Sequence, residues 1–189
     1  MESARPLTLA ELEQGLAHIR QSPLAAGVLE LIVRRPAVGE REVLTEGALD
    51  LRVGLVGDNW RERGSTRTPD GTAHPEMQLT LMNARVAALL AGPRERWPLA
   101  GDQLYVDFDL SLANLPPGTR LQIGSAVVAV TTLPHTGCAK FSERFGSDAL
   151  RFVNAPPHKE LRLRGLNAQV IQPGLVKTGD RVAKLGEAA

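Results

Sequence analysis

The sequence predicts a mostly β domain, a closed or partly open β-barrel with a few short helices and one helix at its N-terminus. Two observations predict it. Short apolar segments follow one another closely along the chain, and glycine and proline separate them. Strands at such close spacing favour a barrel over a βαβ sheet. We expect a helical extension over residues 1–24 and the barrel over residues 25–189.

The first predicted element is a helix over residues 8–20. Thr8 and Glu11 have the spacing of a capping box, in which each side chain satisfies the other's backbone N–H. The apolar residues then recur at helical spacing: Leu9, Leu12, Leu16 and Ile19. Ser22-Pro23 ends this pattern.

Strand patterns follow the helix. In the first half of the chain the predicted strands are residues 28–33, 40–45, 48–56 and 79–82. Residues 57–75 are polar and rich in glycine, proline and arginine, which is typical of a functional or mobile loop. Asn83 suits the N-cap of a short helix over residues 84–90, which Gly92-Pro93 ends.

In the second half the predicted strands are residues 104–110, 121–131 with an interruption at Gly124-Ser125, 168–171 and 181–185. The continuous apolar run over residues 126–130 indicates burial on both faces. Residues 141–154 have a helical pattern that breaks at Gly146-Ser147. Leu161 and Leu163 alternate with Arg162 and Arg164, which is the pattern of a short strand.

Composition excludes several classes of function. The chain carries 22 basic and 21 acidic residues, a formal net charge of +1, so no strong field attracts nucleic acid or an anionic membrane. Aromatic residues make up only 4%, which leaves few platforms for stacking bases. No secretory signal and no membrane-spanning run is visible, and a single cysteine forms no intrachain disulfide. We therefore expect a cytoplasmic protein.

The most informative segment surrounds Cys138, the only cysteine. Residues 135–138 have the composition of a β-turn, with Gly137 at the position that needs a positive φ. The cysteine precedes a predicted helix, and Lys140 and His135 are close in sequence, so its thiolate form should be favoured. A buried cysteine acting as a small hydrophobe is the alternative. His-x-x-Cys also has zinc-ligand spacing, but no further ligands stand at partner positions.

Several motifs together resemble the MOSC domain, named after the C-terminal domain of molybdenum cofactor sulfurases. His135-Thr-Gly-Cys138-x-Lys140-Phe141 is similar to the family's cysteine motif. Arg164-Gly165-x-Asn167-Ala168 is similar to its C-terminal signature, and Gly54-Leu-Val-Gly57-Asp58 to its early Gly-Asp motif. Where many members carry Gly-Glu-Asn-Leu, this chain has Gly101-Asp102-Gln103-Leu104. The resemblance covers residues 25–185.

The resemblance implies a β-barrel and two chemistries for Cys138. In one, its thiolate ligates the molybdenum of a pyranopterin cofactor, as in the family's reductases of N-hydroxylated compounds. In the other, it carries sulfur as a persulfide, received from a pyridoxal-phosphate cysteine desulfurase. Both need an accessible thiolate. A binding module that keeps the fold without chemistry is the third reading.

We favour the molybdenum cofactor version because a basic loop suits a ligand that carries phosphate. In that version Cys138 is the metal ligand, His135 and Lys140 tune its charge, and His135 is also a candidate proton donor. The candidate cofactor-binding residues are Asp58, Arg61, Arg63, Arg67, Arg164 and Asn167. The alternatives are solvated arginines, and turn roles for Asp58 and Asn167. No flavin or iron–sulfur motif is visible, so a reductase would need a separate electron-transfer partner.

Overall fold

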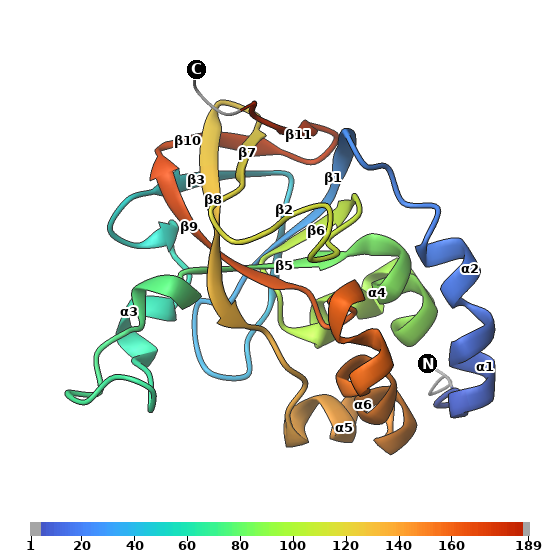
Figure 1. The fold of residues 1–189 in the computed structure, drawn as a ribbon. Helices are drawn as coiled ribbons and strands as arrows, with labels where there is room; N and C mark the ends of the chain where they lie inside the picture. The colour runs from blue at the N-terminus through green and yellow to red at the C-terminus, as the bar shows by residue number, and fades with distance from the viewer. Residues whose placement is uncertain (1–4, 187–189) are drawn as a thin grey trace.

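A computed structural model describes residues 5–186 of the chain. Seven strands close a barrel in the order β1, β11, β7, β8, β9, β5, β6 and back to β1 (Figure 1). They are β1 (Ala26–Arg34), β5 (Leu79–Asn83), β6 (Leu104–Asp107), β7 (Arg120–Ile123), β8 (Ala126–Pro134), β9 (Leu166–Gln172) and β11 (Arg181–Lys184). The predicted fold class is confirmed, and the barrel is fully closed.

The remaining strands lie outside this ring. β2 (Glu42–Leu44) pairs with the end of β1, and a second sheet joins β10 (Gly174–Lys177), β3 (Glu46–Asp50) and β4 (Gly54–Leu55). Every pairing is antiparallel except β5 with β6, which is parallel. The short helix α4 (Ala84–Ala91) and the turns after it make that parallel connection.

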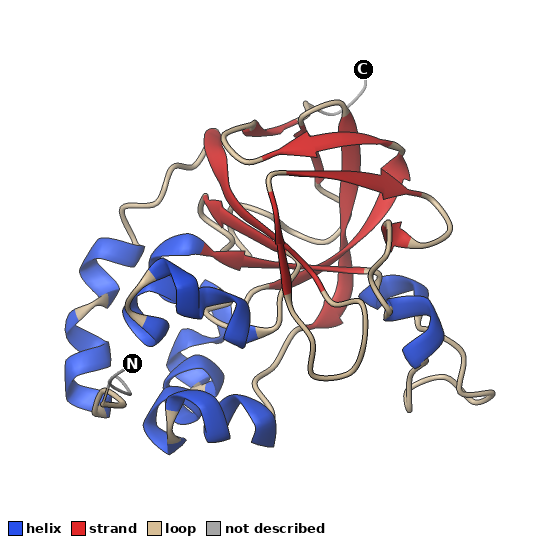
Figure 2. Cartoon of the chain, turned by 180° about the vertical axis from the view of Figure 1, so that it is seen from behind, coloured by secondary structure: helices blue, strands red, loops and turns tan. Residues whose placement is uncertain are grey.

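Most helices gather on one side of the barrel, whereas α3 (Trp60–Arg63) lies apart from them (Figure 2). The gathered helices are α1 (Leu9–Gln14), α2 (Leu16–Ile19), α4, α5 (Ala139–Phe145) and α6 (Ser147–Asn154). Three 3₁₀ helices complete the chain: η1 (Pro75–Met77), η2 (Arg94–Ala100) and η3 (Pro156–Leu161). Within residues 5–186, none of these helices has the length and apolar character that crossing a bilayer would require.

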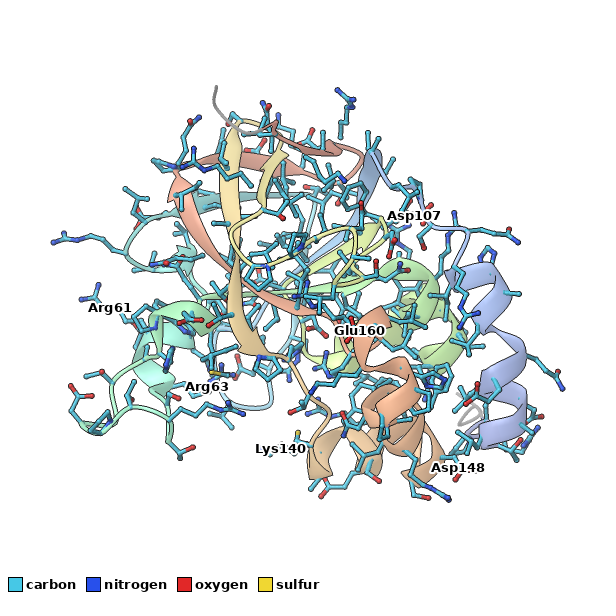
Figure 3. All side chains as sticks on the ribbon, in the orientation of Figure 1. Arg61, Arg63, Asp107, Lys140, Asp148 and Glu160 are labelled. Atoms are coloured by element: carbon cyan, nitrogen blue, oxygen red, sulfur yellow. The ribbon has the colours of Figure 1, made fainter. Side chains whose placement is uncertain are left out.

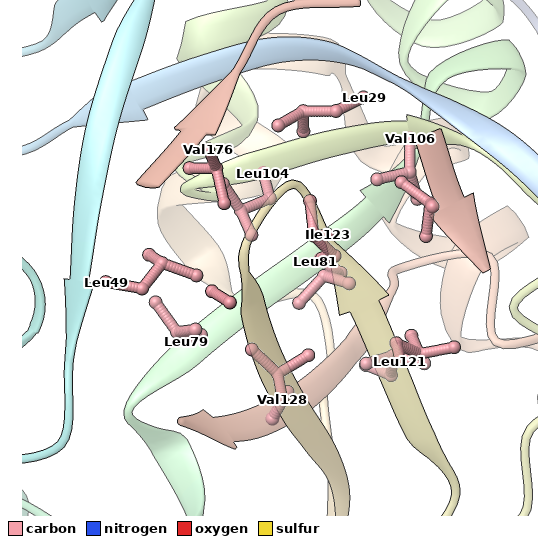
Figure 4. Packing of buried hydrophobic residues seen from close by; sticks show 14 of the residues in the cluster. Leu29, Leu49, Leu79, Leu81, Leu104, Val106, Leu121, Ile123, Val128 and Val176 are labelled. Atoms are coloured by element: carbon pink, nitrogen blue, oxygen red, sulfur yellow. The ribbon is translucent and has the colours of Figure 1, made fainter. Parts of the chain in front are cut away.

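Two apolar cores hold these layers together. Figure 4 shows the first, inside the barrel, where leucine, isoleucine and valine side chains such as Leu29, Leu81 and Val128 meet from opposite strands. The second lies between the barrel wall and the helices and contains Phe141, Phe145 and Phe152. Each fully buried leucine stabilises the fold by about 1.5–3 kcal/mol, so aliphatic packing suffices in a chain with few aromatic residues.

Local sequence signals explain the helix boundaries. Thr8 and Glu11 form the predicted capping box, and the Asn83 side chain accepts a hydrogen bond from the Arg85 backbone as the N-cap of α4. The predicted helix over residues 8–20 is divided into α1 and α2 at Gly15. A Cβ at that position would lie 2.5 Å from Leu89 Cδ2, so a larger residue there would have to displace the Leu89 side chain of α4.

Two sequence expectations are wrong. Residues 161–164 are the end of η3 and a tight turn, because Pro156-Pro157 start a 3₁₀ helix and Arg162 reverses the chain at φ 47°. Residues 48–56 form the end of β3, a turn and β4 rather than one strand. The strand β10 was not predicted, since Pro173-Gly174 has the composition of a turn alone.

Candidate functional site

A cavity of about 660 Å³ lies where β8 leaves the barrel. Its walls are residues 131–137, the end of α6, and the turn over residues 162–166. Three cations, Lys159, Arg162 and Arg164, line it together with one acid, Glu160. The cavity therefore offers a net positive surface to a ligand.

A buried ion cluster forms the floor of this site. Asp102, fully buried, accepts a hydrogen bond from His135 Nε2 at 2.9 Å and one from Arg164 Nη1 at 2.6 Å. Arg164 also donates to the backbone oxygen of Ala100 and lies 5.0 Å from the centre of the Phe141 ring. Burial alone would raise the pKa of Asp102, but Arg164 and His135 outweigh it and hold that pKa at about 2.

His135 is held as a neutral ring. Burial lowers the pKa of His135, the neighbouring Arg164 charge lowers it further, and the Asp102 carboxylate only partly offsets both. Because Asp102 accepts from Nε2, the neutral ring carries its proton there and keeps a lone pair on Nδ1. Among residues 5–186 no hydrogen bond engages Nδ1, so His135 is poised to accept a proton.

Cys138 is exposed and stands at the N-cap of α5, one residue beyond the cavity lining. The predicted turn is wrong, because Gly137 does not have a positive φ and residues 135–138 form no turn. Glycine is needed there for another reason: a Cβ would lie 2.7 Å from Leu150 Cδ1. The Asn154 side chain then fastens Gly137 by accepting from its N–H at 2.9 Å and donating to its carbonyl at 3.1 Å.

One family of known proteins matches this chain. The family model described as the MOSC domain matches residues 72–183, more than half of the chain. This chain belongs to the MOSC domain family. No curated protein sequence matches it.

Solved structures show the same fold in distant MOSC-like chains. The YuaD protein from Bacillus subtilis is 20% identical, with a TM-score of 0.62 over 83% of this chain and 94% of that one. YiiM from Escherichia coli is 19% identical, with a TM-score of 0.53 over 86% of this chain and 71% of that one. Identities this low establish the architecture alone.

The predicted loop arginines of this MOSC domain lie elsewhere. Arg63 and Arg67 line a second hollow of about 650 Å³, formed by the loop after α3 and Met77. Arg61 is exposed, and Figure 3 shows it at the outer side of α3. None of the three lines the cavity that contains His135. Lys140 is exposed on the first turn of α5.

Asp58 and Asn167 are both buried and hold other parts of the MOSC barrel. Asp58 accepts from the Arg35 guanidinium at two distances of 2.8 Å and from the Arg35 backbone N–H, so it orients an arginine. Asn167 donates to the Leu133 carbonyl where the β8–β9 pairing is irregular, and its own buried Oδ1 has no hydrogen-bond partner among the described residues.

The structure adds residues that the sequence did not single out. Asp102, Asn154, Lys159 and Arg162 all shape the site, and the partners of Asp102 and Asn154 lie far along the chain. The only earlier signal was the acid retained after Gly101. Within the part of the chain that the structure describes, no three histidine, cysteine or acidic side chains gather as metal ligands.

Proposed function

We propose that this MOSC domain binds a molybdenum pyranopterin cofactor through the Cys138 thiolate and reduces small N-hydroxylated molecules. The observation that carries the proposal is an exposed thiol on the residue next to Gly137, which lines a cationic cavity whose floor is the Asp102–His135–Arg164 cluster. A soft thiolate suits molybdenum, and guanidinium and ammonium groups suit a phosphate-bearing pterin.

The residues present fit such a group. Arg164 lines the cavity, and its buried Nε has no acceptor among residues 5–186, which is an uncommon state for a charged side chain. Lys159 and Arg162 reach the same cavity from η3 and from the turn that follows it. We therefore assign phosphate binding to Lys159, Arg162 and Arg164 and no longer to the arginines of the loop over residues 57–75.

Each residue then has a defined task. When bound, a molybdenum centre supplies two-electron redox chemistry. Cys138 provides a ligand from a backbone that Asn154 fixes at Gly137. His135, neutral at pH 7, takes up a proton at Nδ1 and passes it to the substrate, and Asp102 keeps the ring oriented through Nε2. Electrons come from a separate partner protein.

The test is the molybdenum content of protein purified from a host that makes the cofactor. Wild type should contain molybdenum and a fluorescent pterin, and Cys138→Ser should lose most of the metal. Ala139→Ser is the matched control, because it changes the next exposed residue and leaves the thiol in place. Equal molybdenum in wild type and Cys138→Ser would refute the ligand role.

A persulfide carrier is the second candidate, favoured by the exposure of Cys138 to a partner protein. The Cys138 thiolate would attack the outer sulfur of a desulfurase persulfide, forming Cys138–S–SH and releasing the desulfurase thiolate. Incubation with a pyridoxal-phosphate cysteine desulfurase and cysteine should then add the mass of one sulfur atom to Cys138. Absence of that adduct in the wild type would exclude this chemistry.

A further inference from the structure

Four arginines converge on one short stretch of backbone. Arg41 donates to the carbonyl of Pro98 at 3.3 Å, Arg144 to Leu99 at 2.7 Å, Arg164 to Ala100 at 2.8 Å and Arg35 to Gly101 at 3.0 Å. These are consecutive carbonyls at the end of η2. The arginines come from the residue after β1, the link to β2, α5 and the turn before β9. Each guanidinium uses one of its N–H groups to satisfy one of these terminal carbonyls. This contact does not use its other N–H groups.

The positive charge here exceeds the negative charge. Arg35 is paired with Asp58 and Arg164 with Asp102. Within residues 5–186, Arg41 and Arg144 have no carboxylate within ion-pair distance. Burial lowers the pKa of Arg41, and the charges of Arg144 and Arg35 lower it further. Two half-buried cations without counter-charges repel each other unless an anion joins them.

An opening at Gly101 gives such an anion a place. This glycine has φ 91°, and a Cβ built on it would meet only Arg41 Nη2 at 3.6 Å and Arg144 Nη1 at 3.8 Å. Two guanidinium groups therefore border one small space. Arg41 Nη2 has no acceptor among the described residues. Charge-assisted N–H···O bonds are about 2.8 Å long, so one oxyanion can accept from both groups.

We propose that Arg41 and Arg144 bind an oxyanion of the phosphate class above Gly101. The site adjoins the candidate reaction centre, because the next residue is Asp102, which holds His135. Its ligand is a free phosphate-bearing small molecule or, in place of the contacts proposed with Lys159, Arg162 and Arg164, the phosphate of a bound cofactor. The anion site itself does not require molybdenum.

The test is a titration of the full chain, purified without cofactor or phosphate, with inorganic phosphate at constant ionic strength set by chloride. The melting temperature of wild type should rise with phosphate, and ³¹P NMR should show binding. The double variant Arg41→Gln/Arg144→Gln should bind phosphate more than tenfold more weakly, because two charge-assisted donors are lost. Without phosphate, its melting temperature should fall below that of wild type by no more than the loss of the Arg41–Pro98 and Arg144–Leu99 hydrogen bonds explains.

The matched control is Arg20→Gln/Arg151→Gln, which removes two exposed arginines on helices away from Gly101. It should bind phosphate like wild type. If the double variant does not fold, Arg41→Lys and Arg144→Lys, which keep the charge and lose the planar donor pair, should each weaken binding. A wild type that phosphate stabilises no more than chloride does, or a control that weakens as much as the test variant, would overturn the proposal.

A second arm identifies the source of the anion. If protein loaded with cofactor no longer takes up inorganic phosphate, the cofactor's phosphate occupies the site. If it still does, the ligand is a separate phosphate-bearing molecule. If the cofactor proposal is wrong, wild type and Cys138→Ser will contain equal amounts of molybdenum. If the anion-site proposal is wrong, phosphate will not stabilise the wild-type protein purified without cofactor.

Discussion

Replacing Asp102 with asparagine should destabilise the protein by about 3–5 kcal/mol, the usual cost of removing one partner from a buried ion pair. Asp102 has no exposed surface, and Arg164 is 8% exposed, so the guanidinium would stay in the interior without its carboxylate. An asparagine oxygen can still accept one hydrogen bond, but it cannot neutralise the Arg164 charge.

The same substitution should remove part of the acid sensitivity of the fold. The pKa of Asp102 is about 2 in the folded protein against an ordinary 3.8, a difference worth about 2 kcal/mol. Since the folded pKa is depressed, this stability is present above pH 4 and is lost as the pH falls toward 2. Wild type should lose it across that window, and Asp102→Asn should not.

Urea unfolding followed by tryptophan fluorescence at pH 7 and at several lower pH values measures both effects. Asp107→Asn is the matched control, because Asp107 is also paired with an arginine, Arg85, but is 30% exposed. It should cost about 1 kcal/mol or less. The reasoning is refuted if the two substitutions cost the same, or if Asp102→Asn keeps the wild-type slope below pH 4.

Three further outcomes follow from the site. Asn154→Ala should destabilise the protein by about 1–3 kcal/mol, because the Gly137 backbone loses both hydrogen bonds with the Asn154 side chain. It should also change the alkylation rate of the Cys138 thiol. Unchanged stability and an unchanged rate would show that Asn154 does not fix this backbone. Gly165→Ala should be far more destabilising than Gly118→Ala in thermal unfolding, because both have positive φ but only Gly165 faces a backbone oxygen at 2.1 Å. NMR titration should place the pKa of His135 below 6.5. Because the unfolded chain then binds the proton more readily, the stability of the fold should decline as the pH falls below 6.5. A pKa at or above 6.5 would contradict the argument from burial.

The sequence patterns were sufficient where neighbouring residues decide the structure. The capping box at Thr8, the N-cap at Asn83 and the glycine interruption at Gly124 each depend on residues within one turn, and each is confirmed. The spacing of short strands also predicted a β-barrel, closed or partly open, and the structure shows that the barrel is closed.

The site was harder to predict because its contacts join distant parts of the chain. Asp102 meets His135 across 33 residues and Arg164 across 62, and neither separation leaves a local pattern. Gly137 was assigned to a turn because turns are the commonest reason for glycine, whereas here contact with α6 excludes a side chain. Local composition cannot distinguish those two causes.

Closure of the ring by β1 and β11 has a consequence for how the protein is made. β1 (Ala26–Arg34) and β11 (Arg181–Lys184) lie far apart along the chain, so β1 cannot pair with β11 until every other barrel strand has been synthesised. Until then β1 carries an unpaired edge, which can join the strands of other nascent chains. Truncation before Arg181 would make that vulnerable intermediate permanent.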